Sequence, residues 1–461
     1  MKHFIQIFIF FIFFLVANIF VSQEKSKEPM KLLNSDVMEN IGGQVREYRG
    51  NVRLQHGNVF SYSDVALQYL LSNKVEFRGN VIIKQNDMTL KSPEIIYDGN
   101  TGIAKADKNI IIIDSNVTVK AKKGVYNTNN YIADFEGDVA ITDESVTITS
   151  QKAKYNRRTL ESDAFGNVVV DDDSVTIFSD ILHYNRKSKE SKNFGNVVIK
   201  GKFNNVYLTG DTLMNYPAKK YTFATGEPIL FQIDTVPENT TLRFDTLSIS
   251  ADSMEAVRGE ETDTPGTGKP GIEKYIFNGN VEIVRGNVFA RSKKAVFFKS
   301  NELFFLEGNP VVWYDSTQLH ADSIIIHIPD NQLEMIHSFG NALAVSRDDT
   351  LNPVRKNQII GYSIKIFFQD KKINKIESIG DAKSLYYMSS EKGNDGVNST
   401  SCDTIYIYFK DDKPLDLVWL GAVEGKYFPE NLVWDKVEEY FLPNYRWAGE
   451  KPRKKKLILR K

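Results

Sequence analysis

A repeat of 29 residues constrains this chain more than any other feature of its sequence. Gly79-Asn80 follows Gly50-Asn51 after 29 residues, and a Gly-Asn or Gly-Asp dipeptide between an aromatic residue and a valine keeps returning in this frame. The glycines of the frame, with the later pair that resumes it, are Gly50, Gly79, Gly137, Gly166, Gly195, Gly279 and Gly308. A unit of this length cannot bury its own apolar face, so consecutive units must stack on one another.

Two further markers travel with the glycines. One is a tyrosine series from Tyr69 to Tyr184, commonly preceded by a pair such as Ser63-Asp64. The other is an alternating apolar pair, whose members are Met88/Leu90, Val117/Val119, Val146/Ile148, Val175/Ile177 and, after a two-residue slip, Val206/Leu208, with Val59 and Val288 in matching frames. Period two among Thr, Val and Ile is typical of strands. The chain is therefore predicted to be nearly all-β.

The repeat also predicts how the strands are joined. Gly-Asn adopts positive φ at low cost, so each dipeptide is predicted to be a structural turn, at the reversal or corner between consecutive strands. Stacked units of this kind form a quasi-one-dimensional solenoid, whose C-terminal units are longer and more irregular. The polar stretches 258–271 and 389–401 are predicted to be surface loops or linkers, and only 434–440 hints at helical spacing.

The start of the chain predicts export. An apolar run from Phe4 to Val21 follows Lys2 and His3, as in a secretory signal, although an uncleaved anchor would have nearly the same length. The predicted organisation is a signal peptide or anchor (1–23), a β-repeat domain (24–257), a polar linker (258–271), a second β-repeat segment (272–345), irregular C-terminal β-repeats (346–445) and a basic tail (446–461). The tail could bind lipid phosphates or be a solvated terminus.

The net charge, the cysteine count and the placement of the histidines exclude several classes of protein. The formal net charge is −1, so no overall field favours nucleic acid. The single cysteine, Cys402, cannot form an internal disulfide and is expected to be buried or idle. His320 and His327 are weighed as a metal site, but ordinary polar surface is the preferred interpretation. We therefore expect neither a metal nor another cofactor.

The motifs resemble the OstA-like (organic solvent tolerance) family, which includes periplasmic LptA-type proteins of lipopolysaccharide transport. The resemblance rests on the exported start, the aromatic-x-Gly-Asn/Asp-Val corner and the following Ser/Ala-Asp-x-x-x-x-Tyr element, over Gly43–Gly226 and Tyr275–Asn341. It implies two antiparallel sheets folded into an elongated jelly roll with a V-shaped groove, whose apolar inside shields the acyl chains of a glycolipid.

The resemblance also implies a place in the cell and a set of partners. It implies a non-enzymatic periplasmic protein that binds lipopolysaccharide and helps carry it to the outer membrane, in association with the inner or outer membrane. Other envelope transport components, or further copies of the chain, would join it by strand addition at the sheet edges. In this interpretation the alternating apolar residues named above, from Val59 to Val288, line the groove.

Three interpretations remain open at this point, and lipid transport is the first of them. The alternating residues could form a closed core with no room for lipid, because alternation shows that a face is buried but not what buries it. Such a closed solenoid would have a structural or adhesive role. A carbohydrate-cleaving β-solenoid is a third possibility, but Asp171–Asp173 is better explained as a solvated turn.

Overall fold

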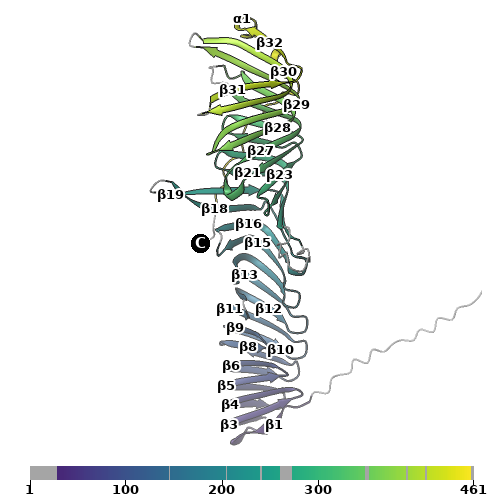
Figure 1. Cartoon of the computed structure of the whole chain (residues 1–461). Coiled ribbons are helices and arrows are strands. Elements are labelled where there is room, and N and C mark those ends of the chain that lie inside the picture. The colour runs from purple at the N-terminus through teal and green to yellow at the C-terminus, as the bar shows by residue number, and fades with distance from the viewer. Residues whose placement is uncertain are drawn as a thin grey trace, which may run out of the picture. The chain divides into compact units, whose positions relative to one another are not determined.

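The structure is a computed structural model that describes residues 28–144, 146–203, 205–238, 241–259, 273–347, 352–390, 393–410 and 413–457. The predicted leader, 1–23, and residues 260–271 of the predicted linker lie outside these ranges. The described chain is almost entirely antiparallel β-structure, which confirms the predicted fold class (Figure 1). It divides into two compact units, residues 1–108 with 127–130, and residues 109–126 with 131–461.

The first unit contains seven strands, of which the long ones run antiparallel to their neighbours in sequence. They are β1 (Lys31–Asn34), β2 (Val37–Ile41), β3 (Val45–His56), β4 (Val59–Tyr69), β5 (Lys74–Gln85), β6 (Met88–Asp98) and β7 (Ile103–Ala106). The register of β5 on β6 places Ile83 opposite Leu90 and Phe77 opposite Ile95.

The second unit continues the same pattern over the rest of the chain, and its strands stack as successive layers (Figure 1). Its first strands are β8 (Ile110–Asp114), β9 (Val117–Ala121), β10 (Lys123–Asn127), β11 (Ile132–Asp143), β12 (Val146–Asn156), β13 (Glu161–Asp171), β14 (Val175–Asn185), β15 (Glu190–Gly201), β16 (Val206–Tyr216), β17 (Tyr221–Thr225), β18 (Ile229–Glu238), β19 (Thr241–Ser250) and β20 (Ser253–Arg258).

The later strands of this unit include the longest of the described residues. They are β21 (Glu273–Arg285), β22 (Val288–Phe298), β23 (Leu303–Glu307), β24 (Val311–Tyr314), β25 (Thr317–His320), β26 (Ser323–His327), β27 (Met335–Arg347), β28 (Lys356–Gln369), β29 (Lys372–Ser390), β30 (Gly393–Lys410), β31 (Lys413–Leu420) and β32 (Glu424–Pro429). The helical pieces are short: η1 (Pro217–Lys219), η2 (Pro329–Asn331), α1 (Glu430–Val433) and η3 (Val437–Tyr440). The stretch predicted as a loop at 389–401 is mostly strand, because β29 and β30 pair as far as Ser390 and Gly393.

The Gly-Asn dipeptides do not reverse the chain; they bend it within a strand. Gly79 and Asn80, both at positive φ, lie inside β5 at a β-bulge, where the two residues stand opposite the single residue Pro93 of β6. Proline suits this place because it has no backbone N–H to leave unpaired in the ladder.

The other glycines of the frame occupy similar positions. Gly50, Gly137, Gly166, Gly195 and Gly279 lie within strands, and Gly308 lies between β23 and β24. Most reversals occur elsewhere, as at Gly57 between β3 and β4. Of the two predicted roles, the structure therefore assigns the corner and not the reversal to these dipeptides.

The Ser-Asp pairs that travel with the repeat stabilise these bends. The Ser63 hydroxyl donates to the Val65 carbonyl at 2.9 Å, across the bend of β4. The next residue, Asp64, accepts a hydrogen bond from the Asn80 amide at 2.9 Å. Asp180 does the same for Asn196, and Asp252 for Asn280. Each layer therefore fixes the corner of a later one.

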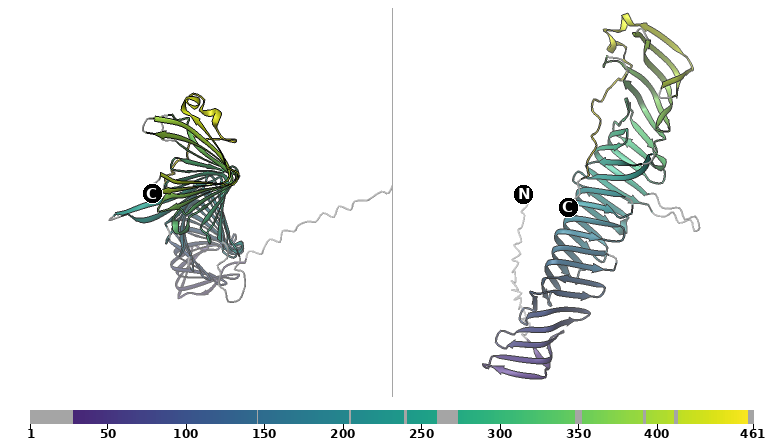
Figure 2. Two further views of the ribbon diagram at one scale, coloured as in Figure 1. Left: turned by 45° about the horizontal axis from the view of Figure 1, so that its top comes forward. Right: turned by 90° about the vertical axis from the view of Figure 1, so that its left-hand side faces the viewer.

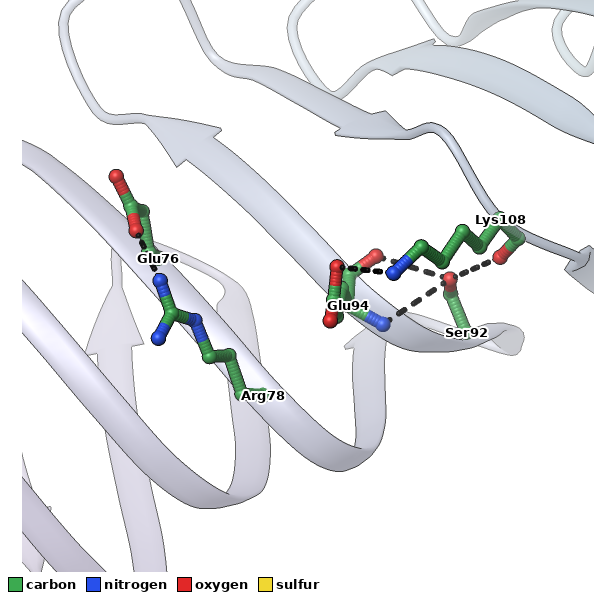
Figure 3. Close-up of polar contacts among 5 residues, drawn as sticks. All are labelled: Glu76, Arg78, Ser92, Glu94 and Lys108. Carbon is green, nitrogen blue, oxygen red and sulfur yellow. Dashed lines mark hydrogen bonds and ion pairs between the residues drawn. The ribbon is translucent and has the colours of Figure 1, made fainter.

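Figure 3 shows one such bend together with its exposed ion pairs. The Ser92 hydroxyl lies 2.7 Å from the Lys108 carbonyl and 2.9 Å from the Glu94 carbonyl, so its proton can be donated to either. The Lys108 ammonium lies 3.2 Å from the Glu94 carboxylate, and Arg78 lies 3.1 Å from Glu76. Three of these four charged side chains are half exposed or more, so the pairs contribute little and the backbone contacts of Ser92 hold the bend.

The bends divide the long strands into two arms that face each other. In the second unit, Phe277 and Leu306 on one arm belong to the same buried cluster as Ile283 and Val312 on the other. We call the arm that contains Phe277 arm A and the arm that contains Ile283 arm B. The residues between the arms are the interior of the fold, as the predicted V-shaped groove requires.

The C-terminal segment, residues 441–457, adds a layer on the outside of arm B. Figure 2 (right) shows the chain after α1 running back along the strands. Gln318 exchanges two hydrogen bonds with the backbone of Ala448, at 2.6 and 2.9 Å, and Lys455 pairs with Glu282 at 3.1 Å. This part of the predicted basic tail is therefore bound to the fold, which corrects the expectation of a solvated terminus for residues 446–457.

The first prediction concerns the bends. Gly79→Ala should lower the melting temperature more than Gly57→Ala, although both glycines have positive φ. Positive φ costs alanine about 1–2 kcal/mol at either site. At Gly79 the new Cβ would also clash with the Asp64 carboxylate, whereas nothing lies within 4 Å at Gly57. Equal melting temperatures for the two variants would contradict the role of the Asp64 contact.

The second prediction concerns His320, which is buried beneath the C-terminal segment and not part of a polar surface. Burial, helped by the charge of Arg446, lowers the pKa of His320 to about 4. The unfolded chain binds the proton near pH 6.5 and the folded chain does not, so stability falls as the pH drops from 6.5 toward 4, by about 1.4 kcal/mol per unit. Thermal unfolding across this range should show a shallower dependence for His320→Gln.

His337 provides the internal reference for that experiment. Burial lowers its pKa as well, and it is present in both proteins, so its contribution cancels in the comparison. Identical pH dependence in the two proteins would show that His320 is not held neutral by the C-terminal segment.

The apolar interior as candidate functional site

An apolar row of cross-strand neighbours runs along the interior of each unit. In the first unit it contains Leu32, Leu54, Ser61, Ile83 and Leu90. In the second unit the register joins Ile112, Val119, Ile141, Ile148, Val170, Ile177, Ile199, Leu208, Leu230, Ile249, Ile283, Ala290, Val312, Leu319, Ala344 and Ile359. Each side chain of this row stands opposite another apolar side chain in the adjacent strand, with the serine of the first unit as the exception.

The predicted lining residues fall into two groups by exposure. Those that are buried are Val59, Met88, Leu90, Val117, Val119 and Ile148. Those that are half-buried are Val146, Val175, Ile177, Val206, Leu208 and Val288. Ile177, Leu208 and Val288 pack against the buried cluster of the second unit. The interior is thus closed over part of its length and accessible over another part.

Polar contacts between the tips of the two arms close the interior in the first unit. We call such a contact a clasp. The His56 ring lies 2.9 Å from the Tyr97 hydroxyl, and the Gln85 amide donates to the Thr128 carbonyl at 3.0 Å. Burial raises the pKa of Tyr97, so its hydroxyl keeps its proton for this contact.

In the second unit the clasps carry charge. The Arg157 guanidinium donates to the Asp114 carboxylate at 2.8 Å, and the Tyr155 hydroxyl donates to the same carboxylate at 3.0 Å. One layer on, Arg186 donates to Asp143 at 3.0 Å. The side chains of Arg157 and Asp114 are each only 8% exposed. Burial alone would lower the pKa of Arg157, but the hydrogen bonds to Asp114 and Tyr126 raise it overall, so the guanidinium stays charged.

The interior beneath the charged clasps is packed. The cavity bounded by Asp143, Arg186, Val146 and Ile148 holds about 10 Å³, which is room for one water molecule at most. At this layer the predicted groove is therefore a closed core, and an acyl chain would have to separate the arms to enter. Asp143 belongs to this clasp and is buried.

The equivalent position in the next repeat does not continue the series. Asp172 follows Asp143 by 29 residues, but its carboxylate accepts hydrogen bonds from the backbone of Ser174 and Val175. The next contact of this kind in the described chain is made by Arg285, which donates to Asn331 at 2.8 Å and pairs with Asp234 and Asp245. The half-buried residues Val175, Ile177, Val206 and Leu208 lie in this stretch.

A larger opening lies between the arms of the C-terminal layers. The cavity there holds about 720 Å³, within the range of ligand sites in proteins. Its apolar wall includes Ile359, Ile373, Ile376, Ile405, Ile407, Phe409, Leu417 and Trp419. Polar side chains, among them Asp315, Arg347 and Lys372, also line it. An apolar wall with charged groups beside it suits a molecule that has an acyl chain and a polar head.

Other candidate sites from the sequence have structural explanations. His320 lies in β25 beside Gln318, and His327 pairs with Glu334 at 2.9 Å. Among the described residues, no three His, Cys, Asp or Glu side chains are grouped so that they could hold a metal ion. Cys402 is a buried free thiol, whose pKa burial raises. The Asp171–Asp173 turn is held by local hydrogen bonds and by the Asp171–Lys202 pair at 3.0 Å.

Sequence reasoning missed the clasps, although their spacing was available. One side of the clasps recurs at a spacing of 29 residues, at His56, Gln85, Asp114 and Asp143. The other side has the same spacing between Arg157 and Arg186. The residue type is kept only between the two charged repeats and changes in the others, so a search for a residue that recurs in every repeat does not find these positions. The tyrosine series was recognised, but not that Tyr97 and Tyr155 reach across to the other arm.

The third prediction tests whether the C-terminal cavity takes apolar ligands. Ser384→Trp places a large side chain in the wall of the cavity and should reduce the binding of a fluorescent fatty-acid probe about tenfold or more. Ser300→Trp, in an exposed turn outside the cavity, is the matched control and should bind the probe as the unaltered chain does. Equal loss in both variants, or in neither, would contradict a ligand site in this cavity.

Comparisons with known proteins agree with the geometry. A family model described as "OstA-like protein" matches residues 27–180 and 136–229. A second model, described as "LptA/(LptD N-terminal domain) LPS transport protein", matches residues 237–332. Most residues that line the C-terminal cavity follow residue 332 and lie beyond both matches.

One solved structure similar to this chain is that of LptH from Pseudomonas aeruginosa. Its title describes LptH as the LptA-homologous periplasmic component of the lipopolysaccharide transport device. The two sequences are 15% identical, the match covers 31% of this chain and 95% of LptH, and the TM-score is 0.25. No curated protein matches this chain. In the part of the chain that the structure describes, no helix is both long and apolar enough to cross a membrane.

Proposed function

Because this chain belongs to the OstA-like family of LptA-type lipopolysaccharide transport proteins, we propose that it carries glycolipid between the membranes of the cell envelope. The observation that carries the proposal is the unbroken apolar row of the second unit, from Ile112 to Ile359. Such a row offers an acyl chain similar surroundings at each successive layer. The lipid can therefore advance without one deep energy minimum.

The energetics favour an apolar conduit for this task. Removing an acyl chain from water contributes about 0.8 kcal/mol per CH₂ group, so a long chain needs continuous apolar surroundings while it crosses an aqueous space. The half-buried residues Val175, Ile177, Val206 and Leu208 supply such surroundings where the arms are open. Net movement needs an energy source outside this chain, because equivalent layers give no direction.

Location and partners form the second part of the proposal. The apolar run from Phe4 to Val21 supports export to the periplasm.

Within the described residues, β31 and β32 pair only with β30, so each presents one edge to a further strand. Leu415 and Leu420 on β31 are 60% and 49% exposed. Strand addition at this edge would join the chain to another component of the bridge or to a second copy. The role requires no covalent chemistry.

The fourth prediction tests lipid contact inside cells. A photoreactive amino acid at Ile177 should cross-link to lipopolysaccharide, because this side chain lies on the interior face. The same amino acid at Phe178 should not, since neighbouring residues of a strand point to opposite faces. Immunoblots for lipopolysaccharide after irradiation give the readout.

Two results would contradict this prediction in different ways. Equal cross-linking at Ile177 and Phe178 would indicate non-specific contact with lipid. No cross-linking at Ile177 or Leu208 would favour a solenoid with a structural or adhesive role, whose interior is never entered.

A further inference from the structure

The charged clasps have properties that a purely structural contact would not need. They lie at the tips of the arms, where the interior would otherwise meet water. Arg157 and Asp114 are nevertheless almost completely buried, and so is Asp143. Burying a charged pair is costly, and an apolar pair of similar volume often stabilises a protein at least as well. The contacts therefore hold the arms together through arginines, and another anion could replace the aspartate that each arginine binds.

We propose that Arg157 and Arg186 form a displaceable binding site for the anionic headgroup of the transported lipid. The proposal rests on the function proposed above. When a lipid oxyanion replaces Asp114 or Asp143 as the partner of the arginine, the tips of the arms separate. The apolar row beneath, at Val119 and Ile148, then becomes accessible to the acyl chains.

The chemistry of arginine suits this exchange. A guanidinium presents several N–H donors in a plane and binds phosphate oxygens as well as carboxylate oxygens. The arginine is therefore never left without a charged partner while the clasp opens, and the released aspartate turns toward water at the tip of its arm. A lipid without a charged headgroup would have to break the Arg186–Asp143 contact with no replacement.

The packing below the clasp explains why opening is needed. The cavity beneath Asp143 and Arg186 holds about 10 Å³, so no acyl chain fits there while the arms are closed. The arms are joined by bends such as Gly137-Asp138 and Gly166-Asn167, where the register of the ladder is interrupted. A bend without continuous ladder pairing is where the two arms can change their angle.

The periodic placement of the clasps supports a role in passage along the row. Asp114 and Asp143 are 29 residues apart, as are Arg157 and Arg186, so the two charged clasps occupy equivalent places in successive repeats. A headgroup that has opened one clasp meets an equivalent arginine in the next repeat. The two clasps thus make the closed layers selective for an anionic lipid.

The fifth prediction is a distance measurement across one clasp. Glu144→Cys and Lys187→Cys, made together in a Cys402→Ser chain, place spin labels at exposed residues next to Asp143 and Arg186. Lipid A, which carries phosphate groups, should shift the distance between the labels upward by about 4 Å or more, the contact distance of one added layer of carbon atoms. Lipid A treated with phosphatase should leave the distance unchanged.

Two further variants test the role of charge. Lys189 also lies 3.8 Å from Asp143, so the clasp is uncharged in Asp143→Asn/Arg186→Gln/Lys189→Gln, and the shift should become equal for the two lipids. Glu76→Gln/Arg78→Gln neutralises an exposed pair (Figure 3) and should keep the preference for phosphorylated lipid. A preference that persists in the uncharged clasp would overturn the assignment of Arg186. So would an unchanged distance with both lipids in the otherwise unaltered chain.

Failure of this proposal can be separated from failure of the transport function. If Ile177 cross-links to lipopolysaccharide while the labels at the clasp never move apart, the interior carries lipid and the clasp stays closed. If neither site responds to lipid, the transport function itself is contradicted.

Discussion

The bend inside each long strand is the constraint on which the rest of the structure depends. In alternate long strands, such as β5 and β11, two consecutive residues at positive φ turn the strand so that its halves enter different arms. Glycine followed by Asn or Asp tolerates this conformation better than other pairs, and the aspartate of an earlier strand fixes the bend through a hydrogen bond, as Asp64 does for Asn80. Without the bend the apolar face would have no opposing face to meet, and there would be no interior.

The parts of the fold that repeat with the same residues could be predicted from the sequence. The 29-residue frame, the strands and the family resemblance all follow from Gly-Asn, Val-x-Ile and tyrosine at fixed spacing. The nature of the bend could not be predicted in the same way, because Gly-Asn also forms tight reversals between strands. Only the register shows that Gly79 and Asn80 stand opposite one residue of the next strand.

The features that close or open the interior depend on contacts between residues that are distant in sequence. The clasp between Arg157 and Asp114 joins residues 43 apart, and the polar residue at the position of Asp114 is His or Gln in earlier repeats. Gln318 meets Ala448 across 130 residues, so nothing in the local pattern places the C-terminal segment on arm B. The large cavity arises among β28, β29 and β30, the long irregular strands that the repeat describes least well.

Quenching of Trp419 fluorescence by a glycolipid with brominated acyl chains would test the account most directly. Trp419 lines the large cavity, and the other three tryptophans, Trp313, Trp434 and Trp447, can be replaced by phenylalanine so that it is the only emitter. The account predicts strong quenching by the brominated lipid and none by the same lipid without bromine. Binding of the lipid without any quenching of Trp419 would contradict an interior that takes up acyl chains.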